Sequence, residues 1–153
     1  MEVKKVVFVG PQGCGKSTTV RYLRDGHFSP LYVKTLGVEV DPIRSGETCY
    51  NIWDCAGDPS VEGLGDGYYA QAHVGVVFCS LADPYSIQSV PYWIERFRAS
   101  QPNAKVILCA TKKDIAFGCV VDQLRAMGQE HGLPIIYTSC KEGVGCDVLL
   151  SAL

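Results

Sequence analysis

The segment that most constrains the fold is an apolar run, residues 6–9, followed at residues 10–17 by the spacing glycine, four residues, glycine, lysine, serine. Glycines at 10, 13 and 15 allow the backbone to turn several N–H groups toward one point, where they can bind an anion. A helix that begins near Lys16 directs the positive end of its dipole to the same point. The alternative is a chance match, which the flanking strand and helix disfavour. The sequence therefore predicts a phosphate-binding loop.

The side chains and backbone of this loop are expected to divide the contacts to a phosphorylated ligand. The Lys16 ammonium reaches the β- and γ-phosphates, and the Ser17 hydroxyl binds an Mg²⁺ ion that bridges them. Gln12 is expected to crowd the space around the γ-phosphate. The remaining ligand contacts are assigned to Gly13, Cys14, Gly15 and Thr18.

Length and composition are typical of one globular domain. The 153 residues suit a single domain spanning 1–153, and 47% hydrophobic with 20% charged residues is ordinary for such a domain. A formal net charge of −2 gives no field that would attract nucleic acid. Residues 1–5 lead directly into a strand, and the sequence has neither a membrane-spanning apolar stretch nor a lipidation motif. We therefore expect an intracellular protein, in the cytoplasm or nucleus, without a membrane anchor.

Eight cysteines could suggest a disulfide framework, but Cys79 and Cys109 lie in apolar runs and are expected to be buried small hydrophobes. No two cysteines have Cys-x-x-Cys spacing, so metal or redox use is not expected. Cys14 is the exception, because Lys16 and a helix N-terminus both favour its thiolate. It is either a redox-sensitive residue or an inert part of the loop.

Alternating strand and helix patterns predict an α/β fold with a doubly wound sheet and helices on both faces. The first strand is expected at residues 4–9, and continuous apolar runs at 74–81, 105–110 and 134–138 are typical of buried parallel strands. Alternating segments at 36–43 and 48–53 predict an antiparallel edge hairpin with its turn at 44–47. The result is a six-stranded, mostly parallel sheet.

Helices are expected around the sheet, and one of them carries a specific prediction. Asp83 should cap a helix with Ile87, Val90, Ile94 and Phe97 on its buried face, and Pro91 should kink it or delay its start. The other expected helices are residues 16–25, a segment around 120–127, residues 145–153, and a short helix at 68–72 after a glycine-rich loop at 54–67.

Asp54 and Gly57 stand at the end of a predicted strand, 38 residues after Lys16. A carboxylate there can hold the magnesium ion through water, and a glycine N–H can reach a γ-phosphate. The Asp-x-x-Gly pattern alone would indicate a plain turn. Its position after a strand that follows a phosphate-binding loop favours the ligand-binding interpretation.

Two further motifs, residues 111–114 and 138–141, follow the fifth and sixth strands, where doubly wound sheets bind ligands. The Asp114 carboxylate can accept two hydrogen bonds from the N1–H and N2–H₂ edge of guanine, which adenine cannot supply. Lys112 and Lys141 can lay their alkyl stems over the faces of the base. The alternative is a pair of solvated charged loops, which four elements in the right order disfavour.

Taken together, these motifs resemble those of the Ras-superfamily small GTPases, and nearly the whole chain takes part in the resemblance. The segments 32–40, 65–72, 90–93 and 106–109 are most similar to the nuclear-transport branch of this family, which is represented by Ran. The resemblance implies a P-loop NTPase G domain that binds GTP or GDP with Mg²⁺. It also implies that Thr35 binds magnesium and the γ-phosphate, that Phe28 packs edge-on against guanine, and that the Cys140 N–H, beside Ser139, donates to the base carbonyl oxygen.

The sequence departs from the family pattern at three site positions. Thr111 replaces the usual asparagine, although Rho-like members also have threonine there, so guanine recognition is still expected. Gln12 stands where Ran has glycine, and Asp58 stands where Ran has the glutamine that positions water. Because aspartate can accept from the water but cannot donate to the phosphoryl group, intrinsic hydrolysis is expected to be slow. Two alternatives are that Asp58 acts as a general base and that the Gln12 amide replaces the missing donor.

The sequence thus predicts a guanine-nucleotide switch, expected to be monomeric, that contacts effectors and regulators through loops 32–40 and 54–70. By resemblance, the first candidate partners are transport factors of the importin-β type. A second hypothesis is a GTP-binding scaffold or decoy that scarcely hydrolyses. A P-loop nucleotide kinase would leave Asp114 and residues 139–141 unexplained.

Overall fold

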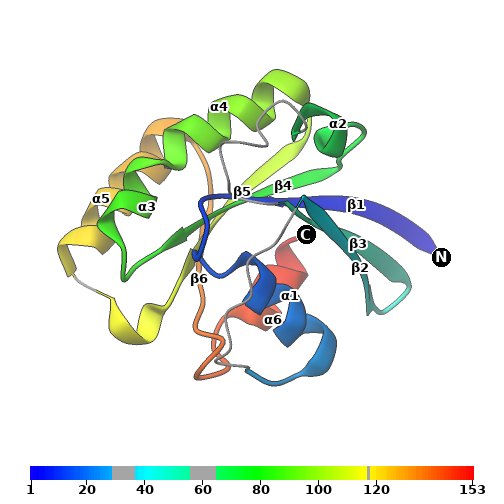
Figure 1. Ribbon diagram of the computed structural model, residues 1–153, viewed down its shortest axis with the longest axis horizontal. Helices are drawn as coiled ribbons and strands as arrows, with labels where there is room; N and C mark the ends of the chain where they lie inside the picture. Colours follow the sequence, from blue (N-terminus) through cyan, green and yellow to red (C-terminus); the bar gives the residue numbers. More distant parts are fainter. Residues whose placement is uncertain (29–36, 56–64, 117) are drawn as a thin grey trace.

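The computed structural model describes residues 1–28, 37–55, 65–116 and 118–153, and its centre is a six-stranded sheet in the order β2-β3-β1-β4-β5-β6 (Figure 1). β2 is antiparallel to β3, and every other neighbouring pair is parallel. The predicted fold class is confirmed. The strands are β1 (Glu2–Val9), β2 (Val38–Ser45), β3 (Thr48–Cys55), β4 (Val74–Ser80), β5 (Lys105–Thr111) and β6 (Ile135–Tyr137).

Alternate residues of the central strands enter two separate cores, one on each face of the sheet. In β1, Val6 and Phe8 belong to one core while Val7 and Val9 belong to the other. The two-residue repeat of a strand sends successive side chains to opposite faces, so a strand covered on both sides must be apolar throughout. All seven residues of β4 are accordingly buried.

The helices form one layer on each face of the sheet (Figure 1). α1 (Lys16–Asp25) and α6 (Cys146–Ala152) cover one face, where Val20 and Leu149 join the core that contains Phe8. The opposite face is covered by α2 (Gly65–Tyr69), α3 (Pro84–Gln88), α4 (Val90–Ser100) and α5 (Gly118–His131). No helix within these described ranges is long and apolar enough to cross a membrane.

The segment predicted as one helix, which Pro91 would kink or delay, is divided into α3 and α4. As expected, the Asp83 carboxylate caps α3 by accepting from the Tyr85 N–H at 3.0 Å. Pro91 has no N–H to donate to the carbonyl of Ile87, so the helical ladder cannot continue through it. The four apolar residues of the predicted stripe are all buried, which shows that the stripe was correctly identified although the helix was not continuous.

The hairpin differs from its predicted bounds because pairing extends beyond the apolar residues. β1 begins at Glu2, opposite Thr48 of β3, and β2 continues to Ser45, also opposite Thr48. These outer ends of the strands are exposed or half-buried. Backbone hydrogen bonds, rather than burial, therefore define where they end.

Candidate nucleotide-binding site

The carboxyl ends of β1, β3, β5 and β6 meet at one edge of the sheet and bring the predicted motifs together. The hydroxyl of Thr111, at the end of β5, donates to the carbonyl of Cys14 at 2.6 Å, although 97 residues separate them. The Lys112 ammonium donates to the carbonyl of Gly13 at 3.1 Å. The loop after β6 approaches α1 as well, where Cys140 Sγ lies 3.8 Å from Thr19 Oγ1. The topology thus gathers these three motifs at one site, as expected of a doubly wound sheet.

Glycine is required at two positions of the loop between β1 and α1 because other chain segments pack directly against its backbone. Gly10 has φ 143°, and a Cβ there would lie 2.6 Å from the carbonyl oxygen of Phe78. Gly15 has φ 99°, and a Cβ there would lie 3.0 Å from Thr111 Cγ2. Side chains at these positions would displace the loop from β4 and β5.

The Lys16 ammonium is buried at the centre of this loop. It donates to the carbonyl oxygens of Gly10 at 2.6 Å and Pro11 at 2.8 Å. These two hydrogen bonds hold the start of the loop against the Lys16 ammonium. A fixed buried ammonium beside the start of α1 produces a strongly attractive site for phosphate.

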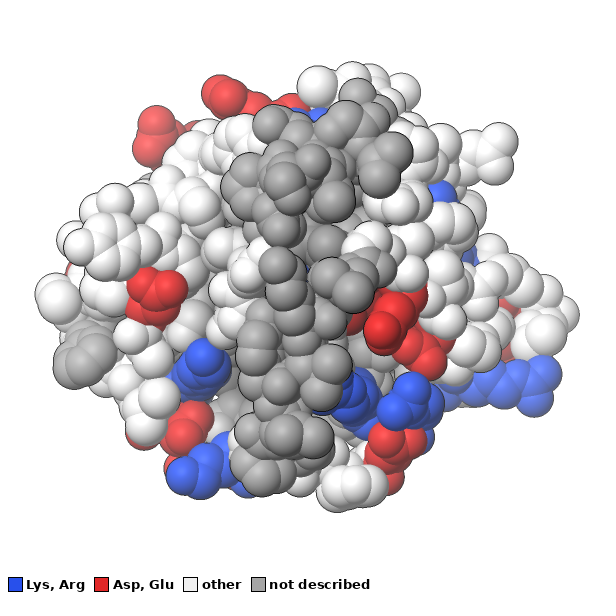
Figure 2. Space-filling model, in the orientation of Figure 1, with Lys and Arg blue, Asp and Glu red and all other residues white. Residues whose placement is uncertain are grey.

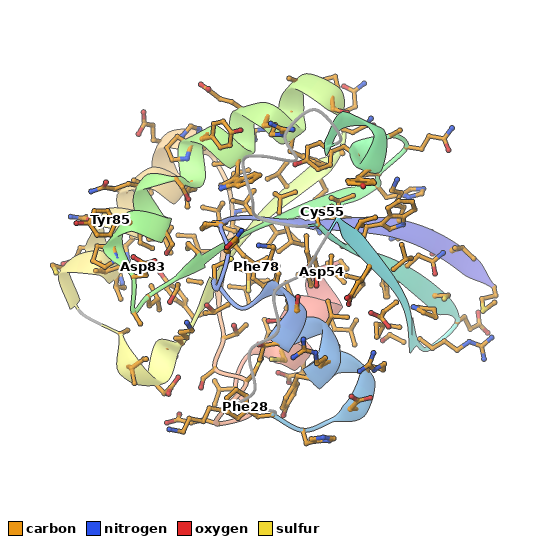
Figure 3. All side chains as sticks on the ribbon, viewed as in Figure 1. Phe28, Asp54, Cys55, Phe78, Asp83 and Tyr85 are labelled. Carbon is orange, nitrogen blue, oxygen red and sulfur yellow. The ribbon has the colours of Figure 1, made fainter. Side chains whose placement is uncertain are left out.

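The Ser17 hydroxyl donates to the Asp54 carboxylate, and this hydrogen bond joins the start of α1 to the end of β3. Figure 3 labels Asp54 at the end of β3. Asp54 is 1% exposed, and its second oxygen, Oδ1, has no hydrogen-bond partner among the residues that the structure describes. Burial raises the pKa of Asp54, and the hydrogen bond from Ser17 and the charge of Lys16 oppose that shift. A buried carboxylate with an unsatisfied oxygen is costly unless a cation or donor compensates it.

These two residues fit a magnesium ion. Mg²⁺ usually takes one or two protein oxygens and completes its coordination with water and phosphate oxygens, so a hydroxyl and a carboxylate suffice. The described residues contain no cluster of three or more carboxylate, histidine or cysteine ligands, which would indicate a metal site built by protein alone. Thr35, the third predicted magnesium ligand, lies outside the described residues.

Burial distinguishes between the two alternatives predicted for Cys14. Cys14 is 1% exposed, and burial raises the pKa of its thiol more than the neighbouring Lys16 ammonium lowers it. Of the two alternatives, the inert loop residue agrees with the structure.

The guanine-binding motif predicted at residues 111–114 is linked to the loop after β6 by a side-chain hydrogen bond. The Ser139 hydroxyl donates to Asp114 Oδ1 at 2.8 Å and accepts from the Glu142 N–H at 3.2 Å. Asp114 lies in η2 (Lys113–Ile115) and is half-buried, whereas Ser139 is buried. Ser139 therefore orients the carboxylate and leaves it accessible to a ligand.

The remaining predicted ligand residues lie at or near this edge with fewer contacts. Gln12, Gly13, Lys112 and Lys141 are exposed, and Thr18 and Cys140 are half-buried. Phe28 is 37% exposed and follows α1 (Figure 3). Gly57 and Asp58, like Thr35, lie outside the described residues, so their predicted roles stay predictions.

Two residues at the site were missed by the sequence analysis. Thr19 is fully buried, and its hydroxyl donates to the Gly15 carbonyl at 2.7 Å. Cys146, the first residue of α6, has its Sγ 3.6 Å from Cys140 Sγ. A Cys-x-x-Cys search cannot find this pair because five residues separate the two cysteines, and the turn between them is what brings them together.

A comparison with protein families agrees with this geometry. Residues 5–114 match the model of the family described as Ras of Complex, Roc, domain of DAPkinase. The matched stretch is more than two thirds of the chain and contains the phosphate-binding loop, Asp54 and Asp114. The predicted membership in the Ras superfamily is confirmed, and the narrower similarity to Ran stays a prediction. The chain belongs to the Roc family of Ras-like GTPase domains.

Proposed function

We propose that residues 1–153 form one guanine-nucleotide switch domain that binds GTP and GDP with Mg²⁺ and hydrolyses GTP slowly. The observation that carries this proposal is the Asp114 carboxylate, held by Ser139 at the same sheet edge as the buried Lys16 ammonium. One group selects a base and the other attracts phosphates, and Thr111 and Lys112 fix the two loops relative to each other.

At the phosphate end, Lys16 would bind the β- and γ-phosphates, and the loop from Gly13 to Thr18 would surround them. Ser17 and Asp54, with Thr35 by resemblance, would hold Mg²⁺. When bound, the ion neutralises charge on the phosphates during phosphoryl transfer. The orphaned Asp54 oxygen supports this assignment because a cation is the partner that a buried carboxylate lacks.

At the base end, Asp114 would accept from the guanine N1–H and N2–H₂ groups. Lys112 and Lys141 would cover the faces of the base, Phe28 would pack against its edge, and the Cys140 N–H would donate to its carbonyl oxygen. A competition experiment tests this assignment. A fluorescent GDP analogue should be displaced by GTP and GDP but not by ATP. Equal displacement by ATP would overturn the guanine assignment, and chromatography of the co-purified nucleotide gives an independent answer.

Slow hydrolysis is the part of the proposal that depends on Asp58 and Gln12. Single-turnover hydrolysis of Mg–GTP should be faster in Asp58→Gln, alone or combined with Gln12→Gly, because glutamine both orients water and donates to the phosphoryl group. A fast wild type that Asp58→Gln slows would identify the carboxylate as catalytic. A wild type that binds GTP and scarcely hydrolyses it in any variant would favour the scaffold or decoy, a function that the missing glutamine also supports.

Partner choice is proposed from the sequence resemblance. Loops 32–40 and 54–70 would contact effectors and regulators in one nucleotide state, with importin-β-like transport factors and a role in nucleocytoplasmic transport as the first candidates. On the face seen in Figure 2, acidic and basic side chains lie beside one another in the lower part of the view. A pull-down with protein loaded with a GTP analogue or GDP should show a difference that Thr35→Ala abolishes. Identical bound proteins in both states would contradict a switch.

A further inference from the structure

The pair Cys140 and Cys146 lies at the base end of the site and has no role in the proposed function. Their sulfur atoms are 3.6 Å apart, and both thiols are free. The turn that joins them is pinned at its base, where Ser139 and Val144 exchange two backbone hydrogen bonds of 2.9 Å each. The Gly143 N–H also donates to the Cys140 carbonyl at 3.3 Å. The proximity of the two thiols is thus built into a hydrogen-bonded turn.

The two thiols differ in access to solvent. Cys140 is half-buried, whereas Cys146, the first residue of α6, is 2% exposed. The hydrogen bond between the two sulfur atoms lowers the pKa of Cys140 and raises the pKa of Cys146. An accessible, more acidic thiol beside a buried partner is the arrangement in which the first is oxidised and the second resolves it.

We propose that Cys140 and Cys146 form a reversible redox modification site that a peroxide converts to a disulfide. The Cys140 thiolate attacks one peroxide oxygen, the O–O bond breaks, and hydroxide leaves and takes a proton to become water. Cys140 is then a sulfenic acid. The Cys146 sulfur attacks the Cys140 sulfur, and the sulfenic oxygen leaves as a second water with the Cys146 proton. Two thiols lose two electrons and the peroxide gains them, and a dithiol reductant reverses the change by thiol–disulfide exchange.

Disulfide formation should alter the base end, a consequence that rests on the proposed guanine-nucleotide function. The sulfurs must approach to about 2.0 Å, so one cysteine has to move. Cys146 is held by the start of α6, and the preceding Gly145 packs so closely that a Cβ there would lie 2.1 Å from the Tyr137 carbonyl oxygen. Cys140 is half-buried and does not belong to a helix, so we expect it to shift more than Cys146, and the backbone N–H assigned to the base carbonyl would move with it. Loss of that one hydrogen bond should weaken GDP binding about fivefold.

The first test treats the full chain with hydrogen peroxide and maps its peptides by mass spectrometry. The wild type should lose the mass of two hydrogen atoms and give a linked peptide containing both cysteines, which a dithiol reductant reverses. Cys146→Ser should instead stop at a Cys140 sulfenic acid that dimedone traps. The exposed Cys119 provides the matched control, since Cys119→Ser should still form the disulfide. No linked peptide, or oxidation of Cys119 as fast as that of Cys140, would overturn the proposal.

A second measurement separates this proposal from the proposed function. The oxidised wild type should bind a fluorescent GDP analogue about fivefold more weakly than the reduced protein, and by linkage saturating GDP should lower the equilibrium constant for disulfide formation in a dithiol buffer about fivefold. Equal affinity of the two forms would overturn the link to nucleotide binding. If the disulfide forms but neither form binds guanine nucleotide, the proposed function fails and the redox site stands.

Discussion

The phosphate end and the base end of the site are held together by contacts of different range. At the phosphate end, Lys16 bonds to carbonyls only five and six residues away, in a loop whose glycines already require the turn. At the base end, Asp114 depends on Ser139, 25 residues later in the chain and on the loop of another strand. Burial differs as well, because Lys16 and Asp54 are buried whereas Asp114 is half-buried.

This difference predicts that the residues at the phosphate end lower the stability of the unliganded fold more than Asp114 does. The phosphate end keeps an ammonium and a carboxylate away from water, and Asp54 Oδ1 has no protein partner within the described segments. Such groups cost free energy until a ligand compensates them. The Asp114 carboxylate is partly solvated and already bonded, so its substitution should change specificity more than folding. Thr111 couples the two ends, since it contacts the phosphate-binding loop from the strand that precedes Asp114.

The largest effect is expected at the phosphate end from Lys16→Ala. Removing a buried charge from the phosphates should cost about 3 to 4 kcal/mol of GTP binding, which is a loss of about two to three orders of magnitude in affinity. Titration of a fluorescent GTP analogue measures this loss. Arg125→Ala, at an exposed arginine on α5, is the control and should bind normally. A loss below tenfold in Lys16→Ala would show that the buried ammonium does not contact the phosphates.

The next largest effect is expected at the base end from Asp114→Asn. The substitution should weaken GTP binding by about 2 to 3 kcal/mol, because it places an amide donor opposite the guanine donors. Xanthosine triphosphate should bind the variant better than it binds the wild type. The unfolding free energy should change little, since an asparagine oxygen can still accept from Ser139. Asp122→Asn on the surface of α5 is the matched control, and equal effects of the two variants on nucleotide choice would refute the role of Asp114.

Thr111→Val tests the coupling between the two ends. Valine keeps the shape of threonine but removes the donor to the Cys14 carbonyl, so the free energy of unfolding should fall by about 1 to 2 kcal/mol. Nucleotide affinity should fall about tenfold, because the loop is no longer held against β5. Urea unfolding and GDP titration measure the two quantities. Thr111→Ser retains the hydroxyl, so its free energy of unfolding and its GDP affinity should be close to those of the wild type. If both stay as low as in Thr111→Val, packing of the threonine methyl group matters and the hydrogen bond does not.

The smallest effect is expected from Asp54→Asn, measured as stability in the absence of metal and nucleotide. Burial raises the pKa of Asp54 in the folded protein, so its contribution to stability is present below the unfolded pKa and is lost as pH rises through the folded pKa. In EDTA, wild-type stability should therefore fall as the solution is brought above about pH 4. Asp54→Asn has no carboxyl to ionise at this position, so at pH 7 without metal its free energy of unfolding should be about 1 kcal/mol higher than that of the wild type.

With Mg²⁺ and GDP present, the wild type should be more stable than Asp54→Asn, because the neutral amide is a poor ligand for the ion. Urea unfolding with EDTA or with Mg–GDP provides both measurements. A variant whose nucleotide affinity responds to Mg²⁺ as strongly as that of the wild type would show that Asp54 does not serve the metal.

Local patterns were sufficient to predict the main elements of the fold. Apolar runs identified the central strands, and the glycine spacing identified the loop that precedes α1, whose bounds agree with the prediction. Element ends were less well predicted, since backbone pairing continues past the apolar residues in the hairpin. Pro91 was expected to kink the helix or delay its start, and the structure divides the segment into α3 and α4.

The sequence by itself determined the residue types assigned to phosphate, magnesium and guanine, because short motifs fix the backbone and the chemistry over a few residues. Only the tertiary structure decided how those residues behave. It buries Cys14 so that its thiol stays protonated, leaves one Asp54 oxygen without a partner among the described residues, and places Cys140 beside Cys146. The physical reason is that burial and long-range contact set desolvation and hydrogen bonding, and neither is encoded in the spacing of a motif.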